Sequence, residues 1–106
     1  MGFFDLFRRA DINQGMNEFQ STVGAVLLDV RTPQEYRGGH LPGSQNIPLQ
    51  AINNAANIII KKVTPIFVYC QSGSRSHQAS AALTRMGYTN VKNIGGIASF
   101  TGKVVR

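Results

Sequence analysis

The sequence has one cysteine, no tryptophan and no long hydrophobic run. A single cysteine among 106 residues excludes an internal disulfide and suits a reducing compartment. No apolar run approaches the roughly 20 residues that a membrane-spanning helix requires. Only 15% of the residues are charged and 42% are apolar, which argues against disorder. The length is that of a single domain with one hydrophobic core.

Acidic residues are also scarce: the sequence has five Asp and Glu residues and eleven Lys and Arg residues, which gives a net charge of +6. Arg8-Arg9 and Lys61-Lys62 are the only adjacent basic pairs. Nucleic-acid-binding proteins usually gather basic residues on one face, often with aromatic residues for stacking. We therefore expect no nucleic-acid partner. A field that attracts small anions, or a solvated surface poor in acids, accounts for the charge.

The first residues of the chain are apolar but lack the order of a targeting signal. The basic pair Arg8-Arg9 follows the apolar part, whereas a secretory signal has the opposite polarity. A cytoplasmic location is expected, with residues 1–11 as an N-terminal extension and 12–106 as the domain. Phe3 and Phe7 share helical spacing, which suits weak contact with a membrane surface, or packing on the domain or a partner.

Apolar runs alternate with helical patterns along the chain, which is typical of βαβ architecture. The apolar runs predict strands at 26–30, 45–47, 66–69 and 90–94. Helices are predicted at 13–20, 49–60 and 75–86, and a shorter helix opens at Thr32. The predicted fold class is α/β, a single small three-layer domain with a mainly parallel central sheet flanked by helices.

Local signals mark several helix ends. Thr32 with Glu35 forms a capping box around Pro33, and Gly87 suits a left-handed cap after the last helix. In the helix predicted at 49–60, Ile52, Ala55, Ala56 and Ile59 share one face. Asparagines within that segment lower its helix propensity.

Cys70 stands at the carboxyl end of the strand predicted at 66–69, where ligands bind in an open parallel sheet. Gly73 can adopt a positive φ, so the loop after Cys70 can turn its N–H groups inward as an anion-binding nest. The nest, the N-terminus of the next helix and the charge of Arg75 all favour a thiolate. Cys70 is therefore the candidate nucleophile, and a buried, inert cysteine is the alternative.

At these residues the sequence resembles the rhodanese domains. The resemblance covers about residues 12–100, with three groups of motifs in the right order. The amino-terminal group is Leu27-Leu28-Asp29-Val30-Arg31, Glu35-Tyr36, Gly39-His40-Leu41-Pro42-Gly43-Ser44 and Asn46-Ile47-Pro48. The active-site loop is Val68-Tyr69-Cys70-Gln71-Ser72-Gly73-Ser74-Arg75-Ser76. The carboxyl-terminal group is Gly87-Tyr88, Asn90-Val91 and Gly95-Gly96-Ile97.

The resemblance implies a sulfurtransferase without a cofactor. Cys70 matches the nucleophile, whose thiolate takes a sulfane sulfur from thiosulfate or a similar anionic donor and holds it as a persulfide. A thiol, cyanide or a sulfur-carrier protein then accepts the sulfur. Arg75 is expected to orient the donor. The residues implied to bind the substrate, mainly through backbone N–H groups, are Gln71, Ser72, Gly73, Ser74 and Arg75.

The sequence departs from the family pattern at two positions. Gln71 stands where many members carry Arg, so one cationic contact to the donor is missing and efficient use of thiosulfate is in doubt. Phe100 stands where the closing motif usually has Trp, a change expected to affect packing only.

Asp29 and Arg31 are predicted to support the site. Asp29 ends a strand close to Cys70 and is expected to hydrogen-bond the loop or to pair with Arg31, a structural role. His40 is predicted to be a packed, hydrogen-bonded histidine, and His77 to approach the mouth of the site. The two histidines and Cys70 lack the spacing of a metal site, so no metal is expected.

Two other functions compete with sulfur transfer from thiosulfate. One is a sulfur-carrier or partner-binding module without efficient thiosulfate turnover, and the single cysteine then requires direct transfer to an external acceptor. The other is a cysteine-dependent phosphatase or arsenate reductase. Those enzymes separate Cys and Arg by five residues, whereas four separate Cys70 from Arg75. The shorter loop favours a sulfur atom over a tetrahedral phosphate.

Overall fold

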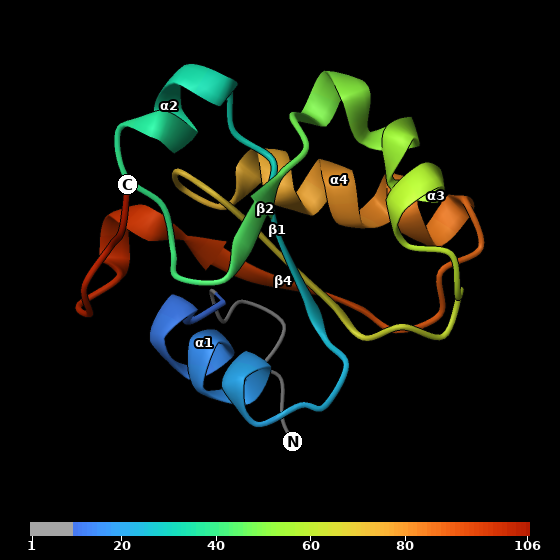
Figure 1. Ribbon diagram of the computed structural model, residues 1–106, viewed down its shortest axis with the longest axis horizontal. Coiled ribbons are helices and arrows are strands. Elements are labelled where there is room, and N and C mark those ends of the chain that lie inside the picture. The colour runs from blue at the N-terminus through green and yellow to red at the C-terminus, as the bar shows by residue number, and fades with distance from the viewer. Residues whose placement is uncertain (1–9) are drawn as a thin grey trace, which may run out of the picture.

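In the computed structural model, which describes residues 10–106, a parallel sheet lies between two layers of helices (Figure 1). Its helices are α1 (Ile12–Gln20), α2 (Pro33–Arg37), α3 (Ala55–Ile58) and α4 (Ser74–Arg85), with 3₁₀ helices η2 (Leu49–Asn54) and η3 (Ile97–Ser99). Its strands are β1 (Val26–Asp29), β2 (Ser44–Asn46), β3 (Ile66–Cys70) and β4 (Val91–Gly96).

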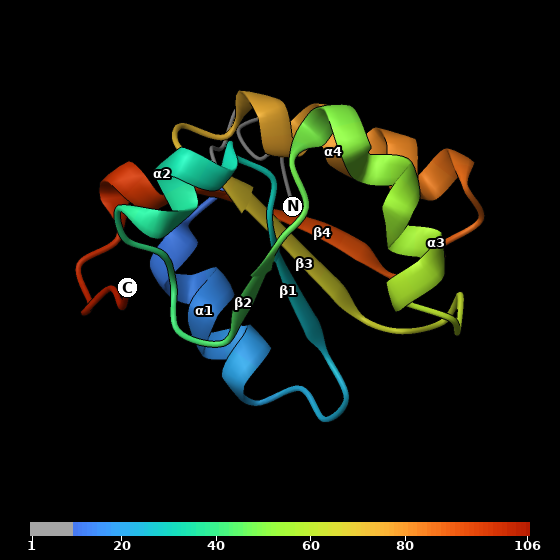
Figure 2. The same cartoon turned by 45° about the horizontal axis from the view of Figure 1, so that its top comes forward.

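The four strands are all parallel and lie in the order β2-β1-β3-β4. Parallel neighbours require a crossover connection, and α2, the η2–α3 segment and α4 supply these connections. Helix α1 covers one face of the sheet, while η2, α3 and α4 cover the other (Figure 2). This arrangement confirms the predicted α/β fold with a parallel sheet flanked by helices.

Alternating side chains of the central strands form two hydrophobic cores. Leu27 and Phe67 face α1, whereas Leu28 and Val68 face α4. Because successive strand side chains point to opposite faces, a strand buried on both sides is apolar throughout, as the run at 66–69 is. Phe100 packs against the α1 core, in agreement with the packing role expected of it.

The helix ends follow the predicted signals. The hydroxyl of Thr32 accepts the N–H of Glu35, and the Glu35 carboxylate accepts the N–H of Thr32, which confirms the capping box. Gly87 has a φ of +105°, the predicted left-handed conformation after α4. The N-cap of α1 is Asp11, which accepts the N–H groups of Asn13 and Gln14 and was missed in the sequence.

The prediction of one continuous helix at 49–60 is wrong. The chain forms the 3₁₀ helix η2 and then the one-turn helix α3, with a non-helical residue, Ala51, inside the first. Ile52, Ala55 and Ile59 are buried as predicted, but Ala56 is exposed. The irregular residue, Ala51, precedes the asparagines that lower the helix propensity of this segment, and the hydroxyl of Tyr88 donates to the carbonyl of Ile59 at 2.6 Å just beyond α3.

Within residues 10–106, no helix is long and apolar enough to cross a membrane. Most of the N-terminal extension predicted at 1–11, together with the membrane or partner contact considered for Phe3 and Phe7, lies outside the described residues.

Candidate active site

Cys70 ends β3 at the carboxyl edge of the sheet, as predicted, and is almost fully buried. Its Sγ accepts the backbone N–H of Gly73 at 3.0 Å and lies 3.5 Å from the Oγ of Ser76. Gly73 has a φ of +107° and is the N-cap of α4, so the loop curls back over the sulfur. One amide of the predicted nest, that of Gly73, therefore contacts the sulfur of Cys70.

Burial and hydrogen bonding act in opposite directions on the Cys70 thiol. Burial raises the pKa of Cys70 because it disfavours the charged form. The Ser76 hydroxyl and the N–H groups of Ser76, Gly73 and Ser72 lower it by more, so the pKa lies below the ordinary value. A lowered pKa increases the thiolate fraction near neutral pH, and the thiolate is the nucleophile.

Arg75 lies in the first turn of α4, but its guanidinium is bound by Glu35 of α2. The Nη1–Oε1 and Nη2–Oε2 distances are 2.8 and 3.0 Å, and both side chains are about one-third exposed. Hydrogen bonds from Arg75 are the main reason that the pKa of Glu35 falls to about 2. The sequence indicated Glu35 only as a capping residue, and its contact with Arg75 was missed.

Asp29 and Arg31 form a buried pair at the end of β1. Asp29 accepts from Nε and Nη2 of Arg31, with the shortest distance at 2.7 Å. Arg31 also donates to the carbonyl of Gly39, and its Nη1 lies 3.5 Å from Oε1 of Gln71. Of the two contacts expected for Asp29, the pairing with Arg31 is therefore correct.

The two histidines have different positions. His40 is half-buried, stacks on Tyr36 at 3.7 Å between ring centroids, and its Nδ1 lies 2.8 Å from the Tyr36 carbonyl oxygen. The prediction of a packed, hydrogen-bonded His40 is confirmed. His77 lines a cavity beside the Cys70 loop, near the mouth of the site, as predicted.

That cavity, of about 630 Å³, extends from the Cys70 loop along the end of β4. Gly73, Gly95 and Gly96 form part of its wall, and a Cβ at Gly96 would lie 2.4 Å from the carbonyl oxygen of Gln71. Glycine is required at that position because the loop and β4 approach so closely. Asn93 also lines the cavity.

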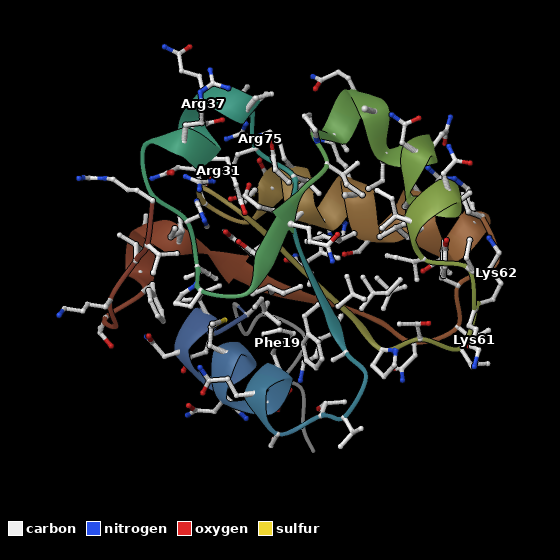
Figure 3. All side chains as sticks on the ribbon, viewed as in Figure 1. Phe19, Arg31, Arg37, Lys61, Lys62 and Arg75 are labelled. Carbon is white, nitrogen blue, oxygen red and sulfur yellow. The ribbon has the colours of Figure 1, made fainter. Side chains whose placement is uncertain are left out.

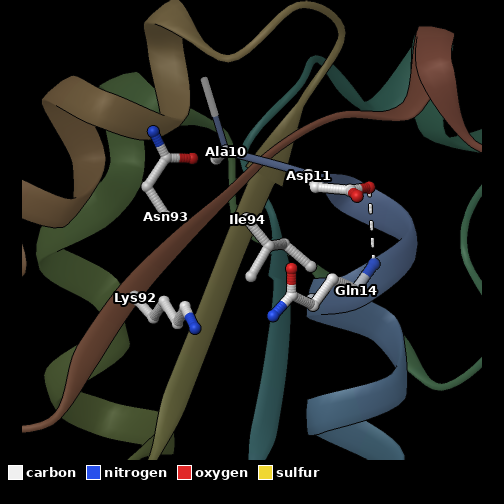
Figure 4. Close-up of a pocket in the computed structure, with 7 residues that line it drawn as sticks. Ala10, Asp11, Gln14, Lys92, Asn93 and Ile94 are labelled. Atoms are coloured by element: carbon white, nitrogen blue, oxygen red, sulfur yellow. Dashed lines mark hydrogen bonds between the residues drawn. The ribbon is translucent and has the colours of Figure 1, made fainter. Parts of the chain in front are cut away.

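A smaller cavity of about 240 Å³ lies between β4 and α1 (Figure 4). Its charged lining groups are Asp11, which caps α1, and Lys92, whose ammonium group pairs with Glu18. Both charged groups therefore already have a partner within the protein. Cys70 does not line this cavity. Within residues 10–106, no cluster of three or more His, Cys, Asp or Glu side chains could hold a metal ion.

Two further polar residues behind Cys70 were missed in the sequence. Ser76 is fully buried, and its Oγ lies 2.7 Å from Oδ1 of Asn93. A serine in the first turn of a helix is common, and a single asparagine in a strand that also carries Lys92 is a weak signal. Only the packing of α4 against β4 brings Asn93 to Ser76, whose hydroxyl lies beside the sulfur.

Comparison with known proteins agrees with this architecture. Residues 10–103 match the family model of the rhodanese-like domain. The chain is 40% identical over 81 residues to the uncharacterised protein YqhL of Bacillus subtilis, covering 76% of this chain and 64% of that protein. It is 41% identical over 71 residues to the thiosulfate sulfurtransferase PspE of Escherichia coli, covering 66% of this chain and 68% of that protein.

A solved structure described as a rhodanese with anions from Escherichia coli has a TM-score of 0.72 and 36% identity, over 77% of this chain and 98% of that one. A human single-domain sulfurtransferase has a TM-score of 0.70 and 26% identity, over 81% and 88% of the two chains. The chain spans less than two-thirds of the length of YqhL and slightly more of PspE. By its sequence match and its fold, the chain belongs to the rhodanese-like domain family.

Proposed function

We propose that this chain transfers a sulfane sulfur from thiosulfate or a similar anionic donor to an external acceptor through a persulfide on Cys70. The observation that carries the proposal is the position of the Cys70 sulfur. It accepts the Gly73 N–H at 3.0 Å inside a loop of inward-facing amides, with its pKa lowered, in a rhodanese-like domain. A thiol whose pKa is lowered by hydrogen-bond donors has the character of a reactive cysteine.

In the first half-reaction, the Cys70 thiolate attacks the outer sulfur of thiosulfate. A bond forms between Sγ and that sulfur, the S–S bond of thiosulfate breaks, and its electron pair leaves with sulfite. The product carries one negative charge on the terminal sulfur of the persulfide. The amides of the loop after Cys70 face this charge and stabilise it as fixed dipoles.

In the second half-reaction, an acceptor thiolate or cyanide attacks the terminal sulfur. The persulfide bond breaks, its electron pair returns to Cys70, and the acceptor leaves as a persulfide or as thiocyanate. Because Cys70 is the only cysteine, no internal thiol can resolve the persulfide, and transfer goes directly to the external acceptor. We propose no cofactor for this cycle.

The arginines bear on the choice of donor. Figure 3 shows Arg31, Arg37 and Arg75 at the end of the molecule that carries α2, far from Lys61 and Lys62. Arg75 faces Glu35 and Arg31 faces Asp29, so each charge is already compensated. These pairs, with Gln71 in the loop, favour a second candidate, a sulfur carrier loaded by a persulfide donor with slow thiosulfate turnover. A Bacillus subtilis relative, 36% identical, is named as a putative sulfur carrier protein.

We propose that the catalytic domain comprises residues 12–106, acts in the cytoplasm, and has no nucleic-acid partner. The rival phosphatase or arsenate reductase activity is disfavoured by the loop of only four residues between Cys70 and Arg75.

Intact-protein mass spectrometry after exposure to thiosulfate tests the proposal. One sulfur atom is expected to add to the reduced protein and to be removed by cyanide or dithiothreitol. Cys70→Ser should gain nothing, and a gain of sulfur by this variant would refute the assignment. A small-molecule persulfide tested in parallel distinguishes the two candidates, because a carrier loads from the persulfide and only slowly from thiosulfate. Hydrolysis of a phosphate ester through Cys70 would support the rival enzyme.

A further inference from the structure

The hydroxyl of Ser76 lies at the centre of a buried hydrogen-bond network behind Cys70. Its Oγ is 3.5 Å from the Cys70 sulfur, 2.7 Å from Oδ1 of Asn93 and 3.0 Å from the carbonyl oxygen of Gly73. A hydroxyl has a single proton to donate but can accept two hydrogen bonds. Three candidate acceptors therefore compete for one proton, and their relative strengths decide where it points.

The side-chain amide of Asn93 has a fixed orientation. The backbone N–H of Gly95 donates to Oδ1 at 3.0 Å, and because an N–H can only donate, the atom there must be the amide oxygen. Nδ2 then faces the carbonyl oxygen of Gly73 at 3.4 Å. Oδ1 is thus an acceptor for the Ser76 hydroxyl, at the shortest of the three distances.

The register of β4 places Asn93 on the face of the sheet that α4 covers, because Asn93 pairs with Val68, a residue of the core beneath α4. Tyr69 then pairs with Gly95, so Ile94 is an extra residue in β4 directly after Asn93. Bulges of this kind are frequent beside active sites. Figure 4 shows Asn93 and Ile94 on opposite sides of β4, with Ile94 toward α1. Asn93 therefore reaches α4 and the Cys70 loop, while Ile94 fills the α1 core.

We propose that Asn93 is a positioning residue for Cys70 that acts through Ser76. The inference rests on the proposed role of Cys70 as nucleophile. In the thiol, the Cys70 S–H donates to Ser76 Oγ and the Ser76 hydroxyl donates to Asn93. When Cys70 loses its proton to solvent, the Ser76 hydroxyl turns to donate to the thiolate. Asn93 keeps the Gly95 N–H as its donor, so no buried polar group is left without a partner.

The other charged groups near the sulfur do not share this network. Arg75 of α4 is bound to Glu35 of α2, and Arg31 is bound to Asp29 at the end of β1. His77 lines the neighbouring cavity from the first turns of α4. Their contributions to the ionisation of Cys70 stay constant when only Asn93 and Ser76 are substituted, which makes a double-mutant cycle interpretable.

The pH dependence of alkylation of Cys70 by iodoacetamide tests the proposal on the reduced full chain. Ser76→Ala should raise the pKa of Cys70 by about one pH unit, since one hydrogen bond to an ionised group is lost, and alkylation at a pH below that pKa should slow by about tenfold. Asn93→Ala should lower the pKa and speed alkylation, because Asn93 accepts the Ser76 hydroxyl only while Cys70 is a thiol and therefore stabilises the thiol. The double variant should equal Ser76→Ala alone, because Asn93 acts through the hydroxyl.

Asn90→Ala and Ser80→Ala are matched controls, one exposed before β4 and one a turn further along α4, and both should behave as wild type. If Asn93→Ala does not fold, Asn93→Asp keeps the shape and both accepted hydrogen bonds. Its carboxylate should raise the pKa, and the rise should shrink when Ser76 is Ala. An unchanged profile in the Asn93 variants, or effects that add fully to Ser76→Ala, would overturn the proposal. Alkylation needs no sulfur donor, so this outcome is independent of the sulfur-transfer test.

Discussion

The guanidinium of Arg75 and the carboxylate of Glu35 form a two-bond ion pair across 40 positions of the sequence. The pair joins the first turn of α4 to α2, the short helix beside the carboxyl edge of the sheet. Charge-assisted bonds of this parallel geometry are directional and hold both partners in place. The cation expected to meet an anionic donor is therefore already oriented, and already partly neutralised, by Glu35.

Glu35→Gln should reduce stability in a pH-dependent way. The pKa of Glu35 is about 2 in the folded chain and near 4.5 when unfolded, so the ionised form favours folding. This contribution is present above about pH 4.5 and is lost as the pH falls through about 2. Because both side chains of the pair are about one-third exposed, we expect Glu35→Gln to lower the free energy of unfolding by only about 1 kcal/mol at pH 7. Urea denaturation of wild type and Glu35→Gln at pH 7, 4 and 3 measures the difference in their free energies of unfolding at each pH.

The conservative change isolates the ion pair. Gln at position 35 can still accept the N–H of Thr32, so the capping box survives while the charge is lost. A difference between wild type and Glu35→Gln that stays constant from pH 7 to pH 3 would contradict the linkage to Glu35.

Arg75→Ala should weaken thiosulfate turnover and leave the fold intact. A lost charge-assisted contact of about 1.5–3 kcal/mol corresponds to a decrease of roughly 10- to 100-fold in kcat/KM for thiosulfate. Steady-state kinetics with cyanide as acceptor measures this, with circular dichroism as a check on folding. Arg37→Ala removes an exposed cation of α2 at the same end of the molecule (Figure 3) and should change kcat/KM little. Equal kinetics for Arg75→Ala and wild type would exclude Arg75 from donor binding.

Gly96→Ala should displace the Cys70 loop. A Cβ on Gly96 would lie 2.4 Å from the carbonyl oxygen of Gln71 and 2.6 Å from Cα of Ser72, so the loop backbone must move. A displacement near 1 Å at reacting groups reduces rates by about 10²-fold. The rate of sulfur loading from thiosulfate, followed by mass spectrometry, reports this loss.

Gly24→Ala is the matched control for that substitution. Gly24 has a φ of +77° with no atom within 4 Å of an added Cβ, so alanine there costs about 1 kcal/mol of backbone strain without touching the loop. Its loading rate should equal that of wild type. Equal rates for both variants would show that the contact between β4 and the loop does not control the site.

Tyr69→Phe should destabilise the fold without altering Cys70. The buried Tyr69 hydroxyl accepts the N–H of Leu41 at 3.0 Å and donates to Oγ of Ser44 at 3.1 Å. Phenylalanine leaves the Leu41 N–H buried without a partner, at a cost of about 1–3 kcal/mol in the free energy of unfolding. Urea denaturation measures this cost, and a loss well below 1 kcal/mol would mean that another group satisfies Leu41.

The pH dependence of this loss has a defined sign. Burial raises the pKa of Tyr69 well above its ordinary value. The hydroxyl therefore keeps its proton and continues to donate to Ser44. The difference between wild type and Tyr69→Phe should therefore be constant from pH 6 to pH 9. A difference that falls within this range would indicate ionisation of Tyr69.

The elements of the fold that depend on local pattern were predictable from the sequence. The unbroken apolar runs at 26–30 and 66–69 indicate strands buried on both faces, and the capping box at Thr32 sets the start of α2. The segment 49–60 was not predictable as η2 and α3, because its apolar positions have helical spacing and the low helix propensity of its asparagines does not indicate where a helix breaks.

The sequence by itself determined the Cys70 loop: one cysteine after an apolar strand, a glycine able to take positive φ, and a helix beginning within a few residues. All of these are close in the chain, so their geometry follows from backbone preferences. Only the tertiary structure decided which groups surround the loop. Glu35 reaches Arg75 because α2 and α4 meet at one edge of the sheet, and Asn93 reaches Ser76 because its register with Val68 places it on the face that α4 covers. Such pairings depend on strand order and register, which no local pattern specifies.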